Sequence, residues 1–283
     1  MKAVLPAAGL GTRLLPITKE LPKEMLPIFV RSVDDGLCLK PMIQAIFEQL
    51  YDFGFREFVI IVGRGKRAIE DHFTPDKGFI ELLKMKNKHS MAVELESFYN
   101  KILTSNIVFV NQPEPRGFGD AVLAARSVVN DPFLLHAGDT YIISKNDEHL
   151  KRLFDVHKKF GADTTILIQE IEDPRAYGVI EGKEVSEGVI LVESLEEKPE
   201  KPRTNLAIMP VYIFDPVIFK ALEIIKPGKG GEIQLTDAIQ KLVDWGLKVY
   251  AVKLKQDEQR LDIGTPQTCW ESLMLSYNYF KKE

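Results

Sequence analysis

The sequence predicts an α/β fold, in which a mixed, mostly parallel sheet has helices on both faces and a smaller lobe at one end of its strands. Short apolar segments alternate with amphipathic ones through the first half of the chain, as strands and crossover helices do. Those short segments are apolar throughout, which is typical of strands covered on both faces. No Gly-, Ser- or Pro-rich linker interrupts the chain, so we expect one domain over residues 1–283, with halves at about 1–165 and 166–283.

The elements of the first half are predicted from the spacing of apolar residues. Strands are expected at residues 3–6, 58–62, 107–110, 133–135 and 164–168. Helices are expected at residues 41–50, 68–73, 120–129 and 148–160. Residues 30–40 are polar and are predicted to form a loop, whereas the charged stretch 77–105 is predicted to form helices packed outside the sheet.

The second half changes character. Residues 177–180 and 188–195 are expected to form antiparallel strands around a polar turn, and further strands are expected at 206–214 and 249–252. Helices are expected at 216–222, from about 236 to 245, and from Pro266 onward. This half is expected to supply the smaller lobe.

Composition and charge exclude several classes of function. Hydrophobic residues make up 45% of the chain, which is enough for a sizeable core, and the net charge is only −4. Because Lys and Arg are scattered, nucleic acids and anionic membranes are not expected as partners. Cys38 and Cys269 match no metal or disulfide spacing, and no stretch approaches the roughly 18 apolar residues of a membrane helix. These features predict a cytoplasmic protein.

The first strand runs into a glycine-rich turn, Ala7-Ala8-Gly9-Leu10-Gly11-Thr12-Arg13. Backbone N–H groups at Gly9 and Gly11 are free to point at an anion, and Arg13 offers a planar fork for phosphate oxygens. Lys23 adds a point charge. The turn lacks the Lys-Ser/Thr of a P-loop and the third small residue of a dinucleotide fingerprint. It is predicted to bind a triphosphate, the alternative being a tight turn with solvated charges.

Other candidate residues follow predicted strands. Gln112 and Asp139 lie where two strands end, and ligands of parallel sheets bind beyond these ends. A carboxylate at Asp139, with Asp262 as a second, suits Mg²⁺, which prefers one or two carboxylates together with phosphate oxygens. For each aspartate the alternative is a turn or helix cap. Lys198 is a candidate for neutralising a substrate phosphate, or else a solvated turn lysine.

Segments spread through the chain resemble the signature of the sugar-1-phosphate nucleotidylyltransferases. They are residues 7–16, Lys23-Glu24-Met25-Leu26-Pro27-Ile28, Tyr177-Gly178-Val179-Ile180, Glu197-Lys198-Pro199 and Gly231-Glu232-Ile233-Gln234-Leu235-Thr236-Asp237. The resemblance extends from residue 1 to about 266. It implies a Rossmann-like fold of the nucleotide-diphospho-sugar transferase type, a nucleotide-binding first half and a sugar-binding second half. It also implies Mg²⁺ as cofactor and assembly as a homodimer or homotetramer.

Within the family, the chain is most similar to the bacterial-type branch that joins UTP to glucose 1-phosphate. The resemblance implies direct attack of glucose 1-phosphate on the α-phosphorus of UTP, giving UDP-glucose and pyrophosphate. It assigns the triphosphate to Arg13 and Lys23, the sugar phosphate to Lys198, and Mg²⁺ to Asp139 and Asp262. The pyrimidine and ribose are implied to lie near Ala8, Gly9, Gly11, Glu24, Gln112 and Gly117, and the sugar hydroxyls near Gly178, Glu197 and Asn205.

Two departures from the family pattern bear on the choice of substrate. Residues 31–38 look like an insertion, and Asp120 stands where the uridylyltransferases often have His. The segment Ala137-Gly138-Asp139 resembles the loop of thymidylyltransferases. A dTTP-dependent glucose-1-phosphate thymidylyltransferase, or an enzyme for another hexose 1-phosphate, therefore remains an alternative. A non-catalytic sensor of sugar nucleotides is an alternative of another class.

Overall fold

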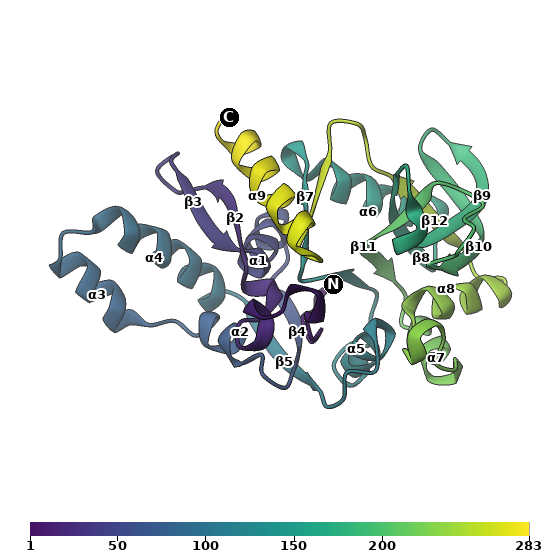
Figure 1. Ribbon diagram of the computed structural model, residues 1–283, viewed down its shortest axis with the longest axis horizontal. Helices are drawn as coiled ribbons and strands as arrows, with labels where there is room; N and C mark the ends of the chain where they lie inside the picture. The colour runs from purple at the N-terminus through teal and green to yellow at the C-terminus, as the bar shows by residue number, and fades with distance from the viewer. Residues whose placement is uncertain (283) are drawn as a thin grey trace.

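A computed structural model describes residues 1–282, and a nine-stranded sheet runs through them (Figure 1). The strand order is β5-β4-β1-β6-β11-β8-β12-β10-β9. The bounds of these strands are β1 Lys2–Pro6, β4 Glu57–Gly63, β5 Asn106–Gln112, β6 Phe133–His136, β8 Thr164–Glu170, β9 Gly178–Ser186, β10 Val189–Glu197, β11 Leu206–Phe214 and β12 Val249–Lys253. Every strand expected from the sequence is therefore present, and all of them belong to this one sheet.

The sheet is mixed, with parallel pairing dominant in its first half. Strand β1 pairs in parallel with β4 and β6, β4 with β5, and β8 with β12. Strand β11 runs antiparallel between β6 and β8, and β9 and β10 form the expected antiparallel pair. The prediction of a mixed sheet is confirmed, but parallel pairs prevail only among the strands of the first half, because β10 also pairs antiparallel with β12.

Helices cover both faces of the sheet because successive strand residues point to opposite sides. In β4, Phe58 and Ile60 join one buried cluster, whereas Val59 and Ile61 join the other. The first cluster includes residues of α1 (Met42–Phe53) and α6 (Glu148–Phe160). The second includes residues of α5 (Phe118–Ala124), α7 (Val217–Ile224) and α8 (Leu235–Asp244). Each face thus has a core of its own.

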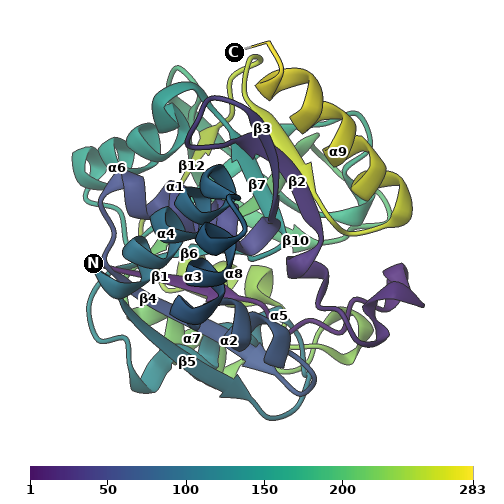
Figure 2. The same cartoon turned by 90° about the vertical axis from the view of Figure 1, so that its left-hand side faces the viewer.

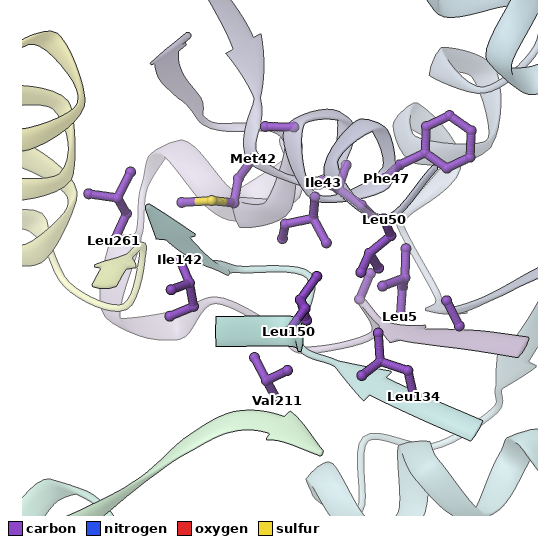
Figure 3. Packing of buried hydrophobic residues seen from close by; sticks show 14 of the residues in the cluster. Leu5, Met42, Ile43, Phe47, Leu50, Leu134, Ile142, Leu150, Val211 and Leu261 are labelled. Atoms are coloured by element: carbon purple, nitrogen blue, oxygen red, sulfur yellow. The ribbon is translucent and has the colours of Figure 1, made fainter. Parts of the chain in front are cut away.

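Figure 3 shows the first of these cores from close by. Leu50 of α1 and Leu150 of α6 lie over Leu5 of β1 and Leu134 of β6, and all four side chains are fully buried. Burying a leucine side chain contributes roughly 1.5–3 kcal/mol. This core therefore fixes the end of β1 from which the glycine-rich turn emerges.

The predicted loop at residues 30–40 is wrong, because a β-hairpin lies there. Strands β2 (Pro27–Arg31) and β3 (Leu37–Pro41) pair antiparallel, and Val30 lies opposite Cys38. Val30 is buried, and so is Lys40, whose ammonium lies 2.7 Å from Glu48 and 2.6 Å from Glu94. The polar residues of this segment concealed its strand pattern in the sequence. The lysine is tolerated in a buried position because carboxylates from two neighbouring helices neutralise it. The long C-terminal helix α9 (Pro266–Phe280) packs beside β2 (Figure 1).

The charged stretch that was expected to be helical forms two helices, α3 (Lys77–Met85) and α4 (His89–Leu103). They follow the short α2 (Arg67–His72) and extend side by side away from the sheet, as Figures 1 and 2 show. A small cluster of Ile80, Leu83 and Ala92 joins them. Among residues 1–282 no helix combines the length and apolar character that crossing a membrane requires.

A second small sheet was not predicted from the sequence. Strands β7 (Thr140–Ile143) and β13 (Gln259–Asp262) pair antiparallel, so that Asp262 lies opposite Thr140. This pairing brings the segment after Asp139 against a segment from the other end of the chain. Seven short 3-10 turns complete the described residues, at Thr12–Leu14, Ile17–Lys19, Lys23–Met25, Ala125–Ser127, Lys145–Asp147, Pro174–Ala176 and Lys229–Gly231.

Candidate active site

One cleft of about 570 Å³ collects nearly all of the residues singled out in the sequence. It lies beyond the carboxyl ends of β1, β5 and β6 and is closed on its other side by residues of β9, β10 and α8. Its lining includes Ala8, Gly9, Gly11, Arg13, Lys23, Glu24, Gln112, Gly117, Asp139, Gly178, Glu197, Lys198 and Asp262. The residues that the strand-end argument grouped therefore lie together at the strand ends, and Asn205 alone of the candidates does not line the cleft.

The glycine-rich turn follows β1 directly. Arg13 lies in the 3-10 turn after Gly11 and is exposed at the cleft. The loop is held in place by Thr18, whose hydroxyl donates a 2.8 Å hydrogen bond to the carbonyl of Gly11. Within residues 1–282 the Arg13 guanidinium makes no hydrogen bond or ion pair, so it is available to an anionic ligand.

Lys23 lies in the 3-10 turn Lys23–Met25 and reaches the carboxylate of Asp139, with which it forms a hydrogen-bonded ion pair. Burial works against the charge of Lys23, but Asp139, Glu24 and Asp262 together hold its pKa above the usual value. Burial likewise opposes the charge of Asp139, yet the neighbouring Lys23 lowers the pKa of this carboxyl. Both groups are therefore charged at neutral pH, in a site that is largely shielded from water.

Asp262 comes to the same place through β13. Burial raises the pKa of Asp262, and the negative charge of Asp139 raises it further. Two carboxylates that repel one another across a cleft favour a cation between them or beside them. Among the described residues, no group of three or more His, Cys, Asp or Glu side chains is placed to hold a metal. Any cation here would need further ligands from substrate or water.

Sequence reasoning missed Lys66, which lies just after the carboxyl end of β4. Its ammonium lies 2.9 Å from the carboxylate of Glu24, and both side chains are buried. Burial raises the pKa of Glu24, while Lys66 and Lys23 lower it. Lys66 follows Gly63-Arg64-Gly65 at a strand end, the same signal that identified Gln112 and Asp139.

Gln112 and Gly117 form one wall of the cleft. The Gln112 amide donates to Asp120 at 2.7 Å, and Asp120 is also bound by Arg116 at 2.7 Å. Gly117 has a φ of 117°, and a Cβ atom there would lie 2.8 Å from both Cβ of Glu232 and the carbonyl oxygen of Ile233. Only glycine fits this position, because it must adopt positive φ and also approach a neighbouring backbone.

The opposite wall carries the candidates for the sugar. Thr236 donates a 2.6 Å hydrogen bond to Glu197, which orients that carboxylate, and the Lys198 ammonium lies 2.8 Å from its other oxygen. A Cβ atom at Gly178 would lie 2.8 Å from the Thr236 hydroxyl and 3.1 Å from Glu197. Lys198 has a φ of 47°, an uncommon backbone conformation for a residue other than glycine, and one that occurs more often at functional sites.

Asn205 lies outside this arrangement. Its side chain is exposed and donates a 3.0 Å hydrogen bond to Glu170 at the end of β8. The cleft is also lined by two residues that the sequence did not single out, Tyr177 and Arg260, and these contact one another. The Arg260 guanidinium donates a 2.6 Å hydrogen bond to the Tyr177 hydroxyl.

Comparisons with known proteins agree with this geometry. Residues 2–277 match the family described as "Nucleotidyl transferase". The chain is 36% identical to the UTP–glucose-1-phosphate uridylyltransferase of Pseudomonas aeruginosa, over 99% of this chain and 97% of that protein. It is 41% identical to the enzyme of the same name from Bacillus subtilis, over 85% of this chain and 80% of that protein.

A solved structure of a UDP-glucose pyrophosphorylase complexed with UDP-glucose superposes on the chain with a TM-score of 0.82. The two sequences are 35% identical, and the match covers 100% of this chain and 99% of the other. The likeness therefore includes the sheet, both walls of the cleft and the helices that flank them.

Proposed function

The chain belongs to the nucleotidyl transferase family, and from this premise we propose that it transfers the uridylyl group of UTP to glucose 1-phosphate. The products are UDP-glucose and pyrophosphate. The observation that carries the proposal is the cleft itself, where Arg13, Lys23 and Lys198 meet two carboxylates between a phosphate loop and a second polar wall. The names of the relatives that match nearly the whole chain support the choice of substrates.

On the nucleotide side, the glycine turn and Arg13 bind the triphosphate, and Lys23 adds a second positive charge. Ala8, Gln112 and Gly117 hold the pyrimidine and ribose, with Glu24 beside them. This assignment is supported by the position of all these residues in one cleft at the strand ends. Residues 1–165 are thus the nucleotide-binding half.

On the opposite side, Lys198 binds the phosphate of glucose 1-phosphate, and Gly178 and Glu197 contact the hydroxyls of the sugar. The hydrogen bond from Thr236 presents Glu197 in a fixed orientation, which suits an acceptor for hydroxyl groups. For Asn205 a contact with the sugar requires the bond to Glu170 to break. Residues 166–283 are thus the sugar-binding half.

Asp139 and Asp262 are proposed to hold Mg²⁺. Two carboxylates fit this ion, because Mg²⁺ keeps several waters and takes further ligands from substrate phosphates. The raised pKa of Asp262 beside the charged Asp139 supports the same assignment, since a bound cation would relieve their repulsion. When bound, the ion supplies positive charge that neutralises phosphate oxygens.

The reaction is a displacement at phosphorus. A phosphate oxygen of glucose 1-phosphate forms a bond to the α-phosphorus of UTP, and the bond to the bridging α–β oxygen breaks, so pyrophosphate leaves with that electron pair. Such transfers depend mainly on positioning and on charge stabilisation. Lys198 aligns the attacking phosphate, while Arg13 and Lys23 stabilise the charge that accumulates on the triphosphate.

The test is pyrophosphate release in the presence of Mg²⁺, with UTP, dTTP, CTP, ATP and GTP each crossed with glucose, galactose and N-acetylglucosamine 1-phosphates. We expect the highest kcat/KM with UTP and glucose 1-phosphate, and loss of activity when the metal is removed with EDTA. A maximum with dTTP would retain the mechanism and reject the assigned base. No release with any pair would reject the enzymatic function in favour of a sensor.

A further inference from the structure

The side-chain amide of Gln112 is held in one orientation by two acceptors. Its Nε2 donates to Asp120 Oδ2 at 2.7 Å and to the carbonyl oxygen of Gly117 at 3.3 Å. Both amide hydrogens are therefore used. Turning the amide by 180° would place Oε1 against a carboxylate and a carbonyl, neither of which can donate a hydrogen bond.

The remaining atom of this amide, Oε1, accepts no hydrogen bond from any of the residues 1–282, and Gln112 lines the cleft. A carbonyl oxygen is thus the group that Gln112 offers to a ligand. An amide free to rotate would offer either an acceptor or a donor and would not distinguish ligands on this basis.

We propose that Asp120 is a positioning residue that sets nucleotide choice, because it fixes Gln112 with its oxygen toward the base and thereby selects pyrimidines that carry an N3–H. The proposal rests on the function proposed above, which places the pyrimidine beside Gln112. Uracil and thymine present a donor at N3, to which Oε1 is complementary. Cytosine presents a lone pair at N3, which Oε1 repels.

Asp120 is itself held firmly. It lies in the first turn of α5, where the helix dipole favours a negative charge, and its side chain is buried. The guanidinium of Arg116 binds its Oδ1 at 2.7 Å, so that Oδ2 is left for Gln112. Asp120 does not line the cleft and acts on the base only through Gln112.

Asp120→Asn tests this arrangement with little change of shape. The guanidinium of Arg116 only donates hydrogen bonds, so it selects the amide oxygen of the new side chain and leaves the NH₂ group facing Gln112. That NH₂ attracts Oε1, whereas the carbonyl of Gly117 still attracts Nε2, and the two orientations of Gln112 become comparable. The preference for UTP over CTP should fall by at least about tenfold.

The measurement is calorimetric titration of the protein with the Mg²⁺ salts of UTP and CTP, which needs no turnover. The ratio of the two dissociation constants is the readout, because these ligands differ only at the base edge. A variant whose binding site is only less well ordered would lose affinity for both nucleotides and keep this ratio. The surface variant Asp131→Asn is the control for charge.

Arg116→Gln is the matched variant within the network. It keeps the carboxylate that faces Gln112, so the ratio should stay within about threefold of the natural protein. If Asp120→Asn fails to fold, Asp120→Ser replaces it, since a hydroxyl both donates and accepts and again frees the amide.

An unchanged ratio in the Asp120 variant would overturn the proposal, and so would a natural protein that binds CTP as tightly as UTP. A ratio that collapses equally in Arg116→Gln would also overturn it, because the carboxylate would not be what orients Gln112. Preference for UTP without pyrophosphate release would reject the proposed function and leave this inference standing.

Discussion

The ammonium of Lys66 lies 2.9 Å from the carboxylate of Glu24, and the two side chains are almost completely buried next to Lys23. A buried carboxylate costs several kcal/mol unless it is paired. Because Lys66 pairs with Glu24, the charge of Lys23 is left for Asp139 and, in the proposed function, for a substrate phosphate. Without Lys66, Lys23 would be the nearest cation for the carboxylates of both Glu24 and Asp139.

Lys66→Met should lower the free energy of unfolding by about 3–5 kcal/mol, because it leaves Glu24 buried without its main partner. The loss should grow as pH rises. Burial without Lys66 raises the pKa of Glu24 further, so the folded state retains a proton that the unfolded state releases, and unfolding becomes easier at higher pH. Urea denaturation between pH 5 and 8 measures both effects.

Two further variants complete this experiment. Glu24→Gln together with Lys66→Met should recover much of the lost stability, because neither position then carries a buried charge. Arg67→Met removes an exposed cation from the next position and should change stability by less than about 0.5 kcal/mol. Equal losses from Arg67→Met and Lys66→Met would refute the role given to the buried pair.

Lys198→Ala should reduce kcat by about a hundredfold or more and leave the circular dichroism spectrum unchanged. In the proposed mechanism its ammonium supplies charge at the attacking phosphate, whereas its ion pair with Glu197 is confined to the cleft wall. Lys201→Ala removes an exposed lysine from the same loop and serves as the control. Steady-state kinetics with glucose 1-phosphate make the comparison, and near-normal turnover of Lys198→Ala would contradict the assigned role.

The sequence alone was enough to predict every strand of the large sheet and most of the cleft. Apolar runs such as Phe58 to Val62 identify a strand without reference to the rest of the chain. The glycines followed by Arg13 predict a phosphate-binding loop, and in the structure this loop lines the cleft. The hairpin at residues 27–41 was missed because its stability depends on carboxylates of α1 and α4 that neutralise Lys40. Lys66 carries the same strand-end signal as Gln112 and Asp139, but its burial against Glu24 depends on a contact between two distant segments, which the sequence does not show.

Gly117→Ala should destabilise the protein by roughly 2–4 kcal/mol. The alanine must adopt positive φ, and its methyl group collides with the backbone of Ile233. Gly54→Ala is a control for positive φ without a collision. Gly54 has a φ of 122° with a ψ of 0°, whereas Gly117 has a φ of 117° with a ψ of 173°, and no atom lies within 4 Å of a Cβ built at Gly54. The control should therefore show the backbone strain alone, about 1–2 kcal/mol. Thermal unfolding of both variants measures the difference, and equal losses would show that the contact with Ile233 yields at no cost.

His149 makes stability depend on pH. It is fully buried in α6, and neither ring nitrogen has a hydrogen-bond partner among the described residues. Burial lowers the pKa of His149 from 6.5 to about 3. Between these values the unfolded chain binds a proton that the folded chain does not, so the free energy of unfolding falls by about 1.4 kcal/mol for each unit that pH decreases. This contribution is complete above pH 6.5 and is lost as pH falls toward 3.

His149→Leu should remove that part of the pH dependence. The side chains are similar in volume, and replacing an unpaired buried polar ring by an apolar group should cost little stability at pH 7. Urea denaturation at pH 7, 6, 5 and 4 should then give a shallower decline than in the natural protein, by about 1.4 kcal/mol per pH unit. His89→Leu changes an exposed histidine on another helix and should retain the full decline. Parallel curves for His149→Leu and the natural protein would show that the buried ring acquires its proton without unfolding.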